Sequence, residues 1–229
     1  GIDKDGRDRT AVCCLSSLNL EKYDEWKDDP DMIGDVMRFL DNVLSDFINK
    51  APEQFKDAKY SAERERSVGL GVMGFHSFLQ KKRIPLESVM SKSWNKKIFK
   101  NIHEKVNQAS KDLAEERGAC PDAAEYGFKE RFSNKTAIAP TASISIICGG
   151  ASPGVEPIAA NSYTHKTLSG SFNVRNRYLE EILESHGKND DETWSTITTN
   201  QGSVSHLDFL TDLEKDVFKT AFELNQKWI

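Results

Sequence analysis

The sequence has few of the features that mark membrane, secreted or nucleic-acid-binding proteins. No stretch approaches the about 18 consecutive apolar residues of a membrane-spanning helix, and no charged and then apolar leader opens the chain. The net charge is -5, which is the wrong sign for a surface that binds the phosphate backbone of DNA or RNA. We therefore expect a cytoplasmic protein that binds neither membranes nor nucleic acids.

Cysteine and histidine are also scarce, and their spacing matches no structural zinc motif, so we expect no metal site. The cysteines are Cys13, Cys14, Cys120 and Cys148. The five histidines have no carboxylate or serine partner at motif spacing, which predicts surface or capping residues. Apart from Glu156, no carboxylate stands out from the solvated faces. In a reducing compartment we would expect any disulfide to be redox-active and not structural.

The apolar residues that are present follow strand and helix patterns in alternation, which predicts one α/β domain over residues 1–229. The predicted elements are a strand over 10–20, a helix over 32–48, a strand over 67–72, a helix over 73–79, a helix over 98–114, a strand over 136–139, a hairpin over 162–174 that turns at Ser169-Gly170, a helix over 178–185, and a last helix from the capping box Thr211–Glu214 through Leu224. The chain opens without a methionine and ends inside a predicted helix, so we expect a piece of a larger protein.

Two segments could bind a phosphate group. Gly69, Gly71 and Gly74 have the G-x-G-x-x-G spacing of a dinucleotide site, but a charged segment precedes them where that site needs a clear strand. Their alternative role is to allow close packing of a strand and a helix. The second segment, 136–157, is an apolar run, then a hydroxyl-rich turn, then glycines and prolines, which suits an anion held by backbone N–H groups. A purely structural turn remains the alternative there.

Cys13 and Cys14 are neighbours on a predicted strand, so their side chains should point to opposite faces. Only one of the two thiols can then face a site. A disulfide between adjacent residues is strained, so a redox bond would join one of them to a cysteine distant in sequence.

Five motifs, in order along the chain, together resemble the large, catalytic subunit of ribonucleotide reductase. They are Ala11-Val-Cys-Cys-Leu-Ser-Ser-Leu-Asn-Leu20, Arg66-Ser-Val-Gly-Leu-Gly-Val72, Glu116-Arg-Gly-Ala-Cys-Pro121, Ala139-Pro-Thr-Ala-Ser-Ile-Ser145 and Ser152-Pro-Gly-Val-Glu-Pro157. The later segments 164–172 and 198–204 resemble the aerobic, class I type. The resemblance covers essentially the whole chain and implies the second half of a ten-stranded α/β barrel.

In that family a thiyl radical removes a hydrogen from the ribose of a ribonucleoside diphosphate, and a cysteine pair then reduces the 2′ position. The resemblance implies that Cys13 is one member of this redox pair and that Cys14 has a packing role. It also implies that Leu15 lines the ribose site. The residues matched to the loop that holds the substrate diphosphate are Pro140, Thr141, Ala142, Ser143 and Ile144.

The resemblance further implies the partners. This chain would bind no cofactor itself and would lack turnover alone, because the thiyl cysteine lies upstream and the radical-relay tyrosines lie downstream. The complete enzyme would contain the remaining segments of a homo-oligomeric large subunit. It would take a radical from a metal-containing small subunit and electrons from a thioredoxin- or glutaredoxin-type reductant, with ATP and dNTP effectors bound elsewhere.

Three alternative functions for the chain remain. They are a fragment of an adenosylcobalamin-dependent class II reductase, a dinucleotide-dependent oxidoreductase, and a non-catalytic assembly module.

Overall fold

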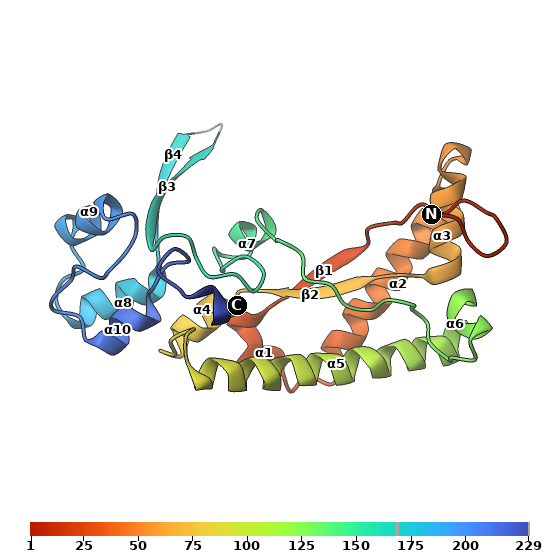
Figure 1. The fold of residues 1–229 in the computed structure, drawn as a ribbon, viewed down its shortest axis with the longest axis horizontal. Coiled ribbons are helices and arrows are strands. Elements are labelled where there is room, and N and C mark those ends of the chain that lie inside the picture. The colour runs from red at the N-terminus through yellow and green to blue at the C-terminus, as the bar shows by residue number, and fades with distance from the viewer. Residues whose placement is uncertain (168–169, 229) are drawn as a thin grey trace. The chain divides into compact units, whose positions relative to one another are not determined.

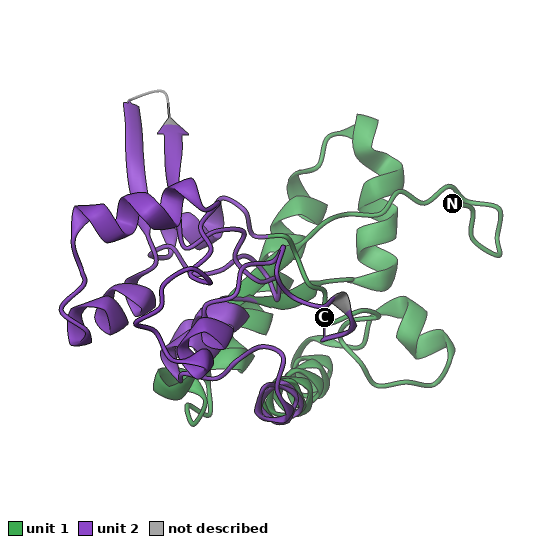
Figure 2. Cartoon of the chain, turned by 60° about the vertical axis from the view of Figure 1, so that its left-hand side comes forward, with its two compact units in different colours: residues 1–18, 23–72, 97–140 green, residues 19–22, 73–96, 141–229 purple. Residues whose placement is uncertain are grey.

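The computed structural model describes residues 1–167 and 170–228, and the chain divides into two compact units (Figure 1, Figure 2). Unit 1 contains residues 1–18, 23–72 and 97–140, and unit 2 contains residues 19–22, 73–96 and 141–229. Each unit is therefore assembled from three separate stretches of sequence. The expectation of a single domain over residues 1–229 stays a prediction.

Unit 1 is built mainly from helices. They are α1 (Tyr23–Trp26), α2 (Met32–Lys50), the 3-10 helix η2 (Glu53–Phe55), α3 (Lys56–Glu65), α6 (Pro121–Glu125) and the larger part of α5 (Val89–Arg117), whose first residues belong to unit 2. The predicted helix over 32–48 is confirmed, because Ile33, Met37, Leu40 and Leu44 recur at helical spacing and are all buried. The helix over 98–114 is also confirmed and ends before Gly118, whose φ of +87° suits a left-handed stop.

Strands β1 (Leu15–Asn19) and β2 (Gly69–Met73) form a two-stranded sheet, and the Gly69 N–H donates to the Cys14 carbonyl at 2.9 Å. The predicted strand over 136–139 is wrong. An isolated bridge joins Leu70 to Thr136, made by the bonds Leu70 N–H to the Lys135 carbonyl at 3.0 Å and Ala137 N–H to the Leu70 carbonyl at 3.3 Å, and the pairing stops after this pair of bonds.

Close to this sheet, unit 1 buries the Asp41 carboxylate among three arginines. Asp41 is fully buried, and its oxygens accept hydrogen bonds from Arg66 Nε at 2.8 Å, Arg117 Nη1 at 2.8 Å and Arg131 Nε at 2.9 Å. Burial by itself would raise the pKa of Asp41, but the bonds from Arg131 and Arg117 outweigh it and hold the pKa below the usual value. The cluster connects α2 to the ends of α3 and α5. The expectation that the carboxylates other than Glu156 lie on solvated faces is therefore wrong for Asp41.

Unit 2 contains the remaining elements. They are η1 (Leu20–Lys22), α4 (Phe75–Lys81), α7 (Ile144–Ile147), β3 (Ser162–Thr167), β4 (Gly170–Arg175), α8 (Arg177–Ser185), α9 (Asp191–Thr199), α10 (Asp212–Val217) and η3 (Gln226–Trp228). The helices α8, α9 and α10 share a core with the loop before α10, formed by Tyr178, Leu179, Leu183, Trp194, Ile197, Val204, Leu207, Leu210, Val217 and Phe218. No helix in the two described ranges is long and apolar enough to cross a membrane.

The hairpin prediction is confirmed, since β3 pairs antiparallel with β4 from Ser162 opposite Arg175 to Thr167 opposite Gly170. The predicted turn position at Ser169 lies outside the described residues. The capping box at Thr211 is confirmed by bonds in both directions between Thr211 and Glu214.

The last helix is shorter than predicted, because α10 ends at Val217. Beyond it the Thr220 N–H donates to Glu223 at 2.8 Å, and the Ala221 N–H donates to the Ile158 carbonyl at 2.8 Å. These bonds turn the backbone out of the helix and leave Phe222 exposed.

Candidate functional site

The two adjacent cysteines differ sharply in their surroundings. Both precede β1. Cys13 is exposed, whereas Cys14 is buried and its thiol donates to the Leu40 carbonyl of α2, with 3.7 Å between sulfur and oxygen. Burial raises the pKa of the Cys14 thiol, which disfavours the reactive thiolate. The expected packing position of Cys14 therefore agrees with the structure, and the accessible thiol of the pair is Cys13.

Two of the motif glycines, Gly69 and Gly71, lie so close to neighbouring segments that a side chain at either position would clash. A Cβ on Gly69 would lie 2.4 Å from Leu15 Cδ2, and a Cβ on Gly71 would lie 2.1 Å from the Ala137 carbonyl oxygen. On the side to which a Cβ would point, Gly69 and Gly71 are thus covered by protein, so a pyrophosphate cannot approach their backbone from that side. The prediction of close packing is correct, although the neighbour here is the extended segment around Ala137 and not a helix.

The hydroxyl-rich turn leads into the short helix α7 and presents free backbone donors. Within the described part of the chain, the N–H groups of Ala142, Ser143 and Ile144 donate to no acceptor, and all three residues are exposed. Ser143 is the N-cap of α7, and its hydroxyl makes no capping bond. Three consecutive N–H groups at a helix start are suited to bind an anion.

The start of this loop is anchored by Thr141, which is buried and has a φ of +55°. A positive φ is unusual for a β-branched residue and is strained. The Thr141 hydroxyl accepts from the Gly154 N–H at 2.7 Å, and the Thr141 carbonyl accepts from the Ser145 N–H at 2.9 Å. Nearby, Ser77 and Ser152 exchange backbone-to-hydroxyl bonds of 3.1 and 2.9 Å, which fix the following segment to α4.

The predicted site residues fall into both units. Thr141, Ala142, Ser143 and Ile144 lie together in unit 2, whereas Cys13, Leu15 and Pro140 belong to unit 1. No group of three or more His, Cys, Asp or Glu side chains in the described ranges is arranged to hold a metal ion.

His76 of α4 also holds the segment that follows the loop. The prediction that the histidines are surface or capping residues is wrong for His76, which is buried and accepts the Ile158 N–H at Nδ1 over 3.0 Å. Burial lowers the pKa of His76 to about 4, so the ring is neutral at pH 7 and the proton is on Nε2.

We expect His76 to make the folded state less stable in acid. Because the folded pKa of about 4 is below the ordinary value of 6.5, the unfolded chain binds the proton first and stability falls as pH drops between these values. The loss should reach roughly 3 kcal/mol below pH 4, at about 1.4 kcal/mol for each pKa unit. Urea unfolding at pH 7 and pH 4.5 measures it. His76→Asn, which offers an acceptor oxygen and does not titrate, should lack this component; an equal loss in both proteins would contradict the assignment.

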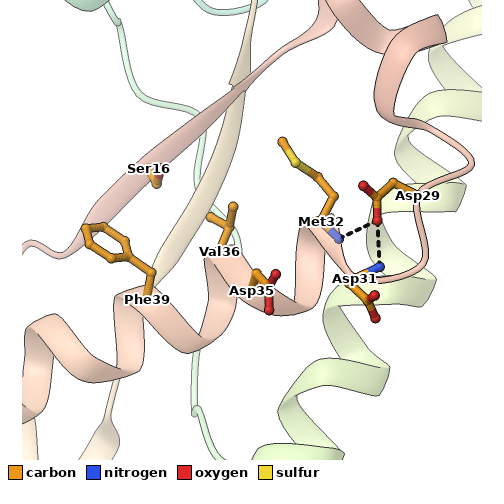
Figure 3. Close-up of a pocket in the computed structure, with 7 residues that line it drawn as sticks. All are labelled: Ser16, Asp29, Asp31, Met32, Asp35, Val36 and Phe39. Atoms are coloured by element: carbon orange, nitrogen blue, oxygen red, sulfur yellow. Dashed lines mark hydrogen bonds between the residues drawn. The ribbon is translucent and has the colours of Figure 1, made fainter.

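A separate pocket of about 530 Å³ lies in unit 1, lined by residues of β1, α2 and the turn before α2. Figure 3 shows the Asp29 carboxylate of this pocket accepting from the N–H groups of Asp31 and Met32, at 2.9 and 3.1 Å. The pocket's other lining residues are Ser16, Asp35, Val36 and Phe39. None of the predicted site residues lines it, and the Asp29 bonds serve to start α2.

The chain belongs to the ribonucleotide reductase family, because the model of the ribonucleotide reductase barrel domain matches residues 2–130 and 122–229. It is 52% identical to the ribonucleoside-diphosphate reductase large subunit of Invertebrate iridescent virus 6, over 96% of this chain and 23% of that protein. A solved class Id ribonucleotide reductase alpha subunit from Actinobacillus ureae is 41% identical, with a TM-score of 0.85, over 93% of this chain and 39% of that one.

A vitamin B12-dependent ribonucleoside-diphosphate reductase from Thermoplasma acidophilum is less similar, at 34% identity over 94% of this chain and 29% of that protein. The chain thus spans less than half the length of each of these relatives. Its fold is part of an α/β barrel, as expected, and the strands described here do not close a barrel.

Proposed function

We propose that this chain is the second half of the catalytic barrel of a class I-like ribonucleoside-diphosphate reductase large subunit. The observation that carries the proposal is the loop in which Ala142, Ser143 and Ile144 offer three unpaired N–H groups from a strained, anchored turn. Such a loop would bind the diphosphate of the substrate as a handle, and residues 140–145 include no Lys of the kind that clamps a transferred phosphoryl group. Pro140, which directly precedes Thr141 in the chain, would belong to the same loop.

Cys13 would be one member of the redox pair that reduces the ribose, and Leu15 would line the ribose site. The exposure of Cys13 supports this role, because disulfide formation needs access to the sulfur. The oxidised pair would be returned to two thiols by a thioredoxin- or glutaredoxin-type reductant. The other cysteine of the pair would come from another segment of the large subunit.

The partners in this proposal are the remaining segments of a homo-oligomeric large subunit and a metal-containing small subunit that supplies the radical. ATP and dNTP effectors would bind outside this chain, and the chain alone would not turn over. The greater similarity to the class Id alpha subunit than to the vitamin B12-dependent enzyme supports a separate radical-generating subunit. The expected cytoplasmic location is part of the same proposal.

Loss of the Thr141 hydroxyl tests the loop. In a large subunit carrying these residues, Thr141→Val should weaken binding of a ribonucleoside diphosphate about tenfold, or about 1.4 kcal/mol, because the Gly154 N–H loses its acceptor and the loop is released. Isothermal titration with the diphosphate measures the change.

Thr141→Ser keeps the hydroxyl and should retain most of the affinity. The matched control is Thr199→Val, which removes an exposed hydroxyl bonded only within α9 at 2.9 Å and should leave the affinity unchanged. If the unmodified protein binds no ribonucleoside diphosphate, the substrate-site proposal fails and the assembly module becomes the better interpretation.

A further inference from the structure

The Glu21 side chain is a buried carboxylate outside the predicted site. It lies in η1, just after β1, and is only 4% exposed. The Tyr178 hydroxyl donates to Glu21 Oε1, and Arg177 Nη2 donates to Glu21 Oε2 at 2.9 Å. Burial and the neighbouring Glu21 carboxylate raise the pKa of Tyr178, so its hydroxyl keeps the proton that it donates.

The backbone around Glu21 is fixed as well. The Glu21 N–H donates to Asn19 Oδ1 at 3.0 Å, and Lys81 Nζ donates to the Glu21 carbonyl at 3.3 Å. A Cβ on Gly74, whose φ is +79°, would lie 2.9 Å from Asn19 Oδ1 and 3.3 Å from the Glu21 nitrogen. The Glu21 backbone is thus anchored next to Gly74, and its carboxylate, bonded to Tyr178, is a fixed support for the Arg177 guanidinium.

The same Arg177 nitrogen also donates to the Gly149 carbonyl at 2.7 Å. Gly149 comes directly after Cys148, the C-cap of α7, and has a φ of +91°. Arg177 therefore connects the fixed carboxylate of Glu21 to the end of the segment whose first residues carry the unpaired N–H groups.

The loop is thus held at two points. At its start, the Thr141 hydroxyl binds the Gly154 N–H, and at its end Arg177 binds Gly149. We propose that Arg177, supported by Glu21, is a positioning residue that fixes α7 so that its first N–H groups face the substrate diphosphate. This inference rests on the proposed function of the loop. A buried ion pair adds little net stability by itself, so a positional role gives a reason for placing Glu21 beside Arg177.

Steady-state kinetics of the complete large subunit with a ribonucleoside diphosphate tests the role of Arg177. For Arg177→Ala we expect KM to rise about tenfold while kcat falls less than threefold, because the loop still exists but is no longer held in its binding position. Arg177→Lys should recover part of the affinity. Glu21→Gln should raise KM in the same way, and the double variant Glu21→Gln/Arg177→Ala should be no worse than Arg177→Ala.

The matched control is Arg175→Ala, which removes an arginine two residues away that pairs with the exposed Asp191 at 2.7 Å. It should change neither KM nor kcat. Hydrogen exchange over residues 141–150 gives a readout independent of activity, and it should accelerate in Arg177→Ala but not in Arg175→Ala.

The outcomes separate the two proposals. If the unmodified protein binds the diphosphate and Thr141→Val weakens binding, but Arg177→Ala leaves KM and the exchange rate unchanged, the inference about Arg177 is overturned and the loop function stands. A loss of kcat with unchanged KM in Arg177→Ala also overturns it. If the unmodified protein binds no diphosphate, the loop function itself fails, and faster exchange in Arg177→Ala would then indicate a purely structural clamp.

Discussion

Cys13→Ser is expected to abolish deoxyribonucleotide formation with dithiol reductants, by roughly a thousandfold or more, because a hydroxyl cannot replace a thiol in a disulfide-forming step. Cys14→Ser should leave most of the turnover. The Cys14 thiol is buried against Leu40, so its replacement should cost about 1–2 kcal/mol of stability and little catalysis.

Two measurements check this contrast in the complete large subunit. Initial rates with a dithiol reductant give the effect on catalysis, and thiol alkylation of the folded protein gives accessibility. Cys13 should react quickly and Cys14 only when the protein unfolds, as their exposures predict. Equal loss of turnover in the two variants would refute the assignment of Cys13.

Asp41→Asn should destabilise the folded protein by about 3–5 kcal/mol, because it leaves three buried or half-buried arginines without the carboxylate that compensates them. The guanidinium groups of Arg66, Arg117 and Arg131 would then repel one another across the neutral amide. Because the pKa of Asp41 is lowered in the folded state, this contribution is fully present above about 3.8, the ordinary value, and is lost as pH falls from there toward the lower folded pKa.

Urea unfolding followed by circular dichroism measures the loss. The control is Asp46→Asn in the same helix, which removes an exposed pair with Lys50, with side chains 62% and 76% exposed, and should change stability by less than about 0.5 kcal/mol. Similar losses in the two variants would show that the arginine cluster does not depend on the Asp41 charge.

The long helices were predictable because their apolar residues repeat at the helical period and their ends carry recognisable stops. Gly118 ends α5, and Thr211 starts α10 with its capping box. In contrast, α3 and α9 were missed because they are rich in polar residues and show little apolar periodicity. The end of α10 was misplaced because a tertiary bond from Ala221 to Ile158 turns the chain there.

The site was predictable only in part. The sequence motifs mark Cys13 and the loop beginning at Pro140, and local chemistry explains why such a loop suits an anion. The residues that hold the loop could not be found in this way. Glu21 and Arg177 are 156 positions apart. No local sequence pattern distinguishes the buried His76 from an exposed histidine. Sequence spacing gives no information on pairs that only tertiary structure brings together.

The two units interleave along the chain, which crosses between them after residues 18, 22, 72, 96 and 140. During synthesis on the ribosome, unit 1 cannot be complete until residue 140 has emerged, and the segments 19–22 and 73–96 must wait for residues made much later. The nascent chain therefore exposes apolar residues of both units for most of its translation. A chaperone that binds nascent chains would meet this protein over that whole interval, and a chain cut after residue 140 would carry all of unit 1 together with two isolated pieces of unit 2.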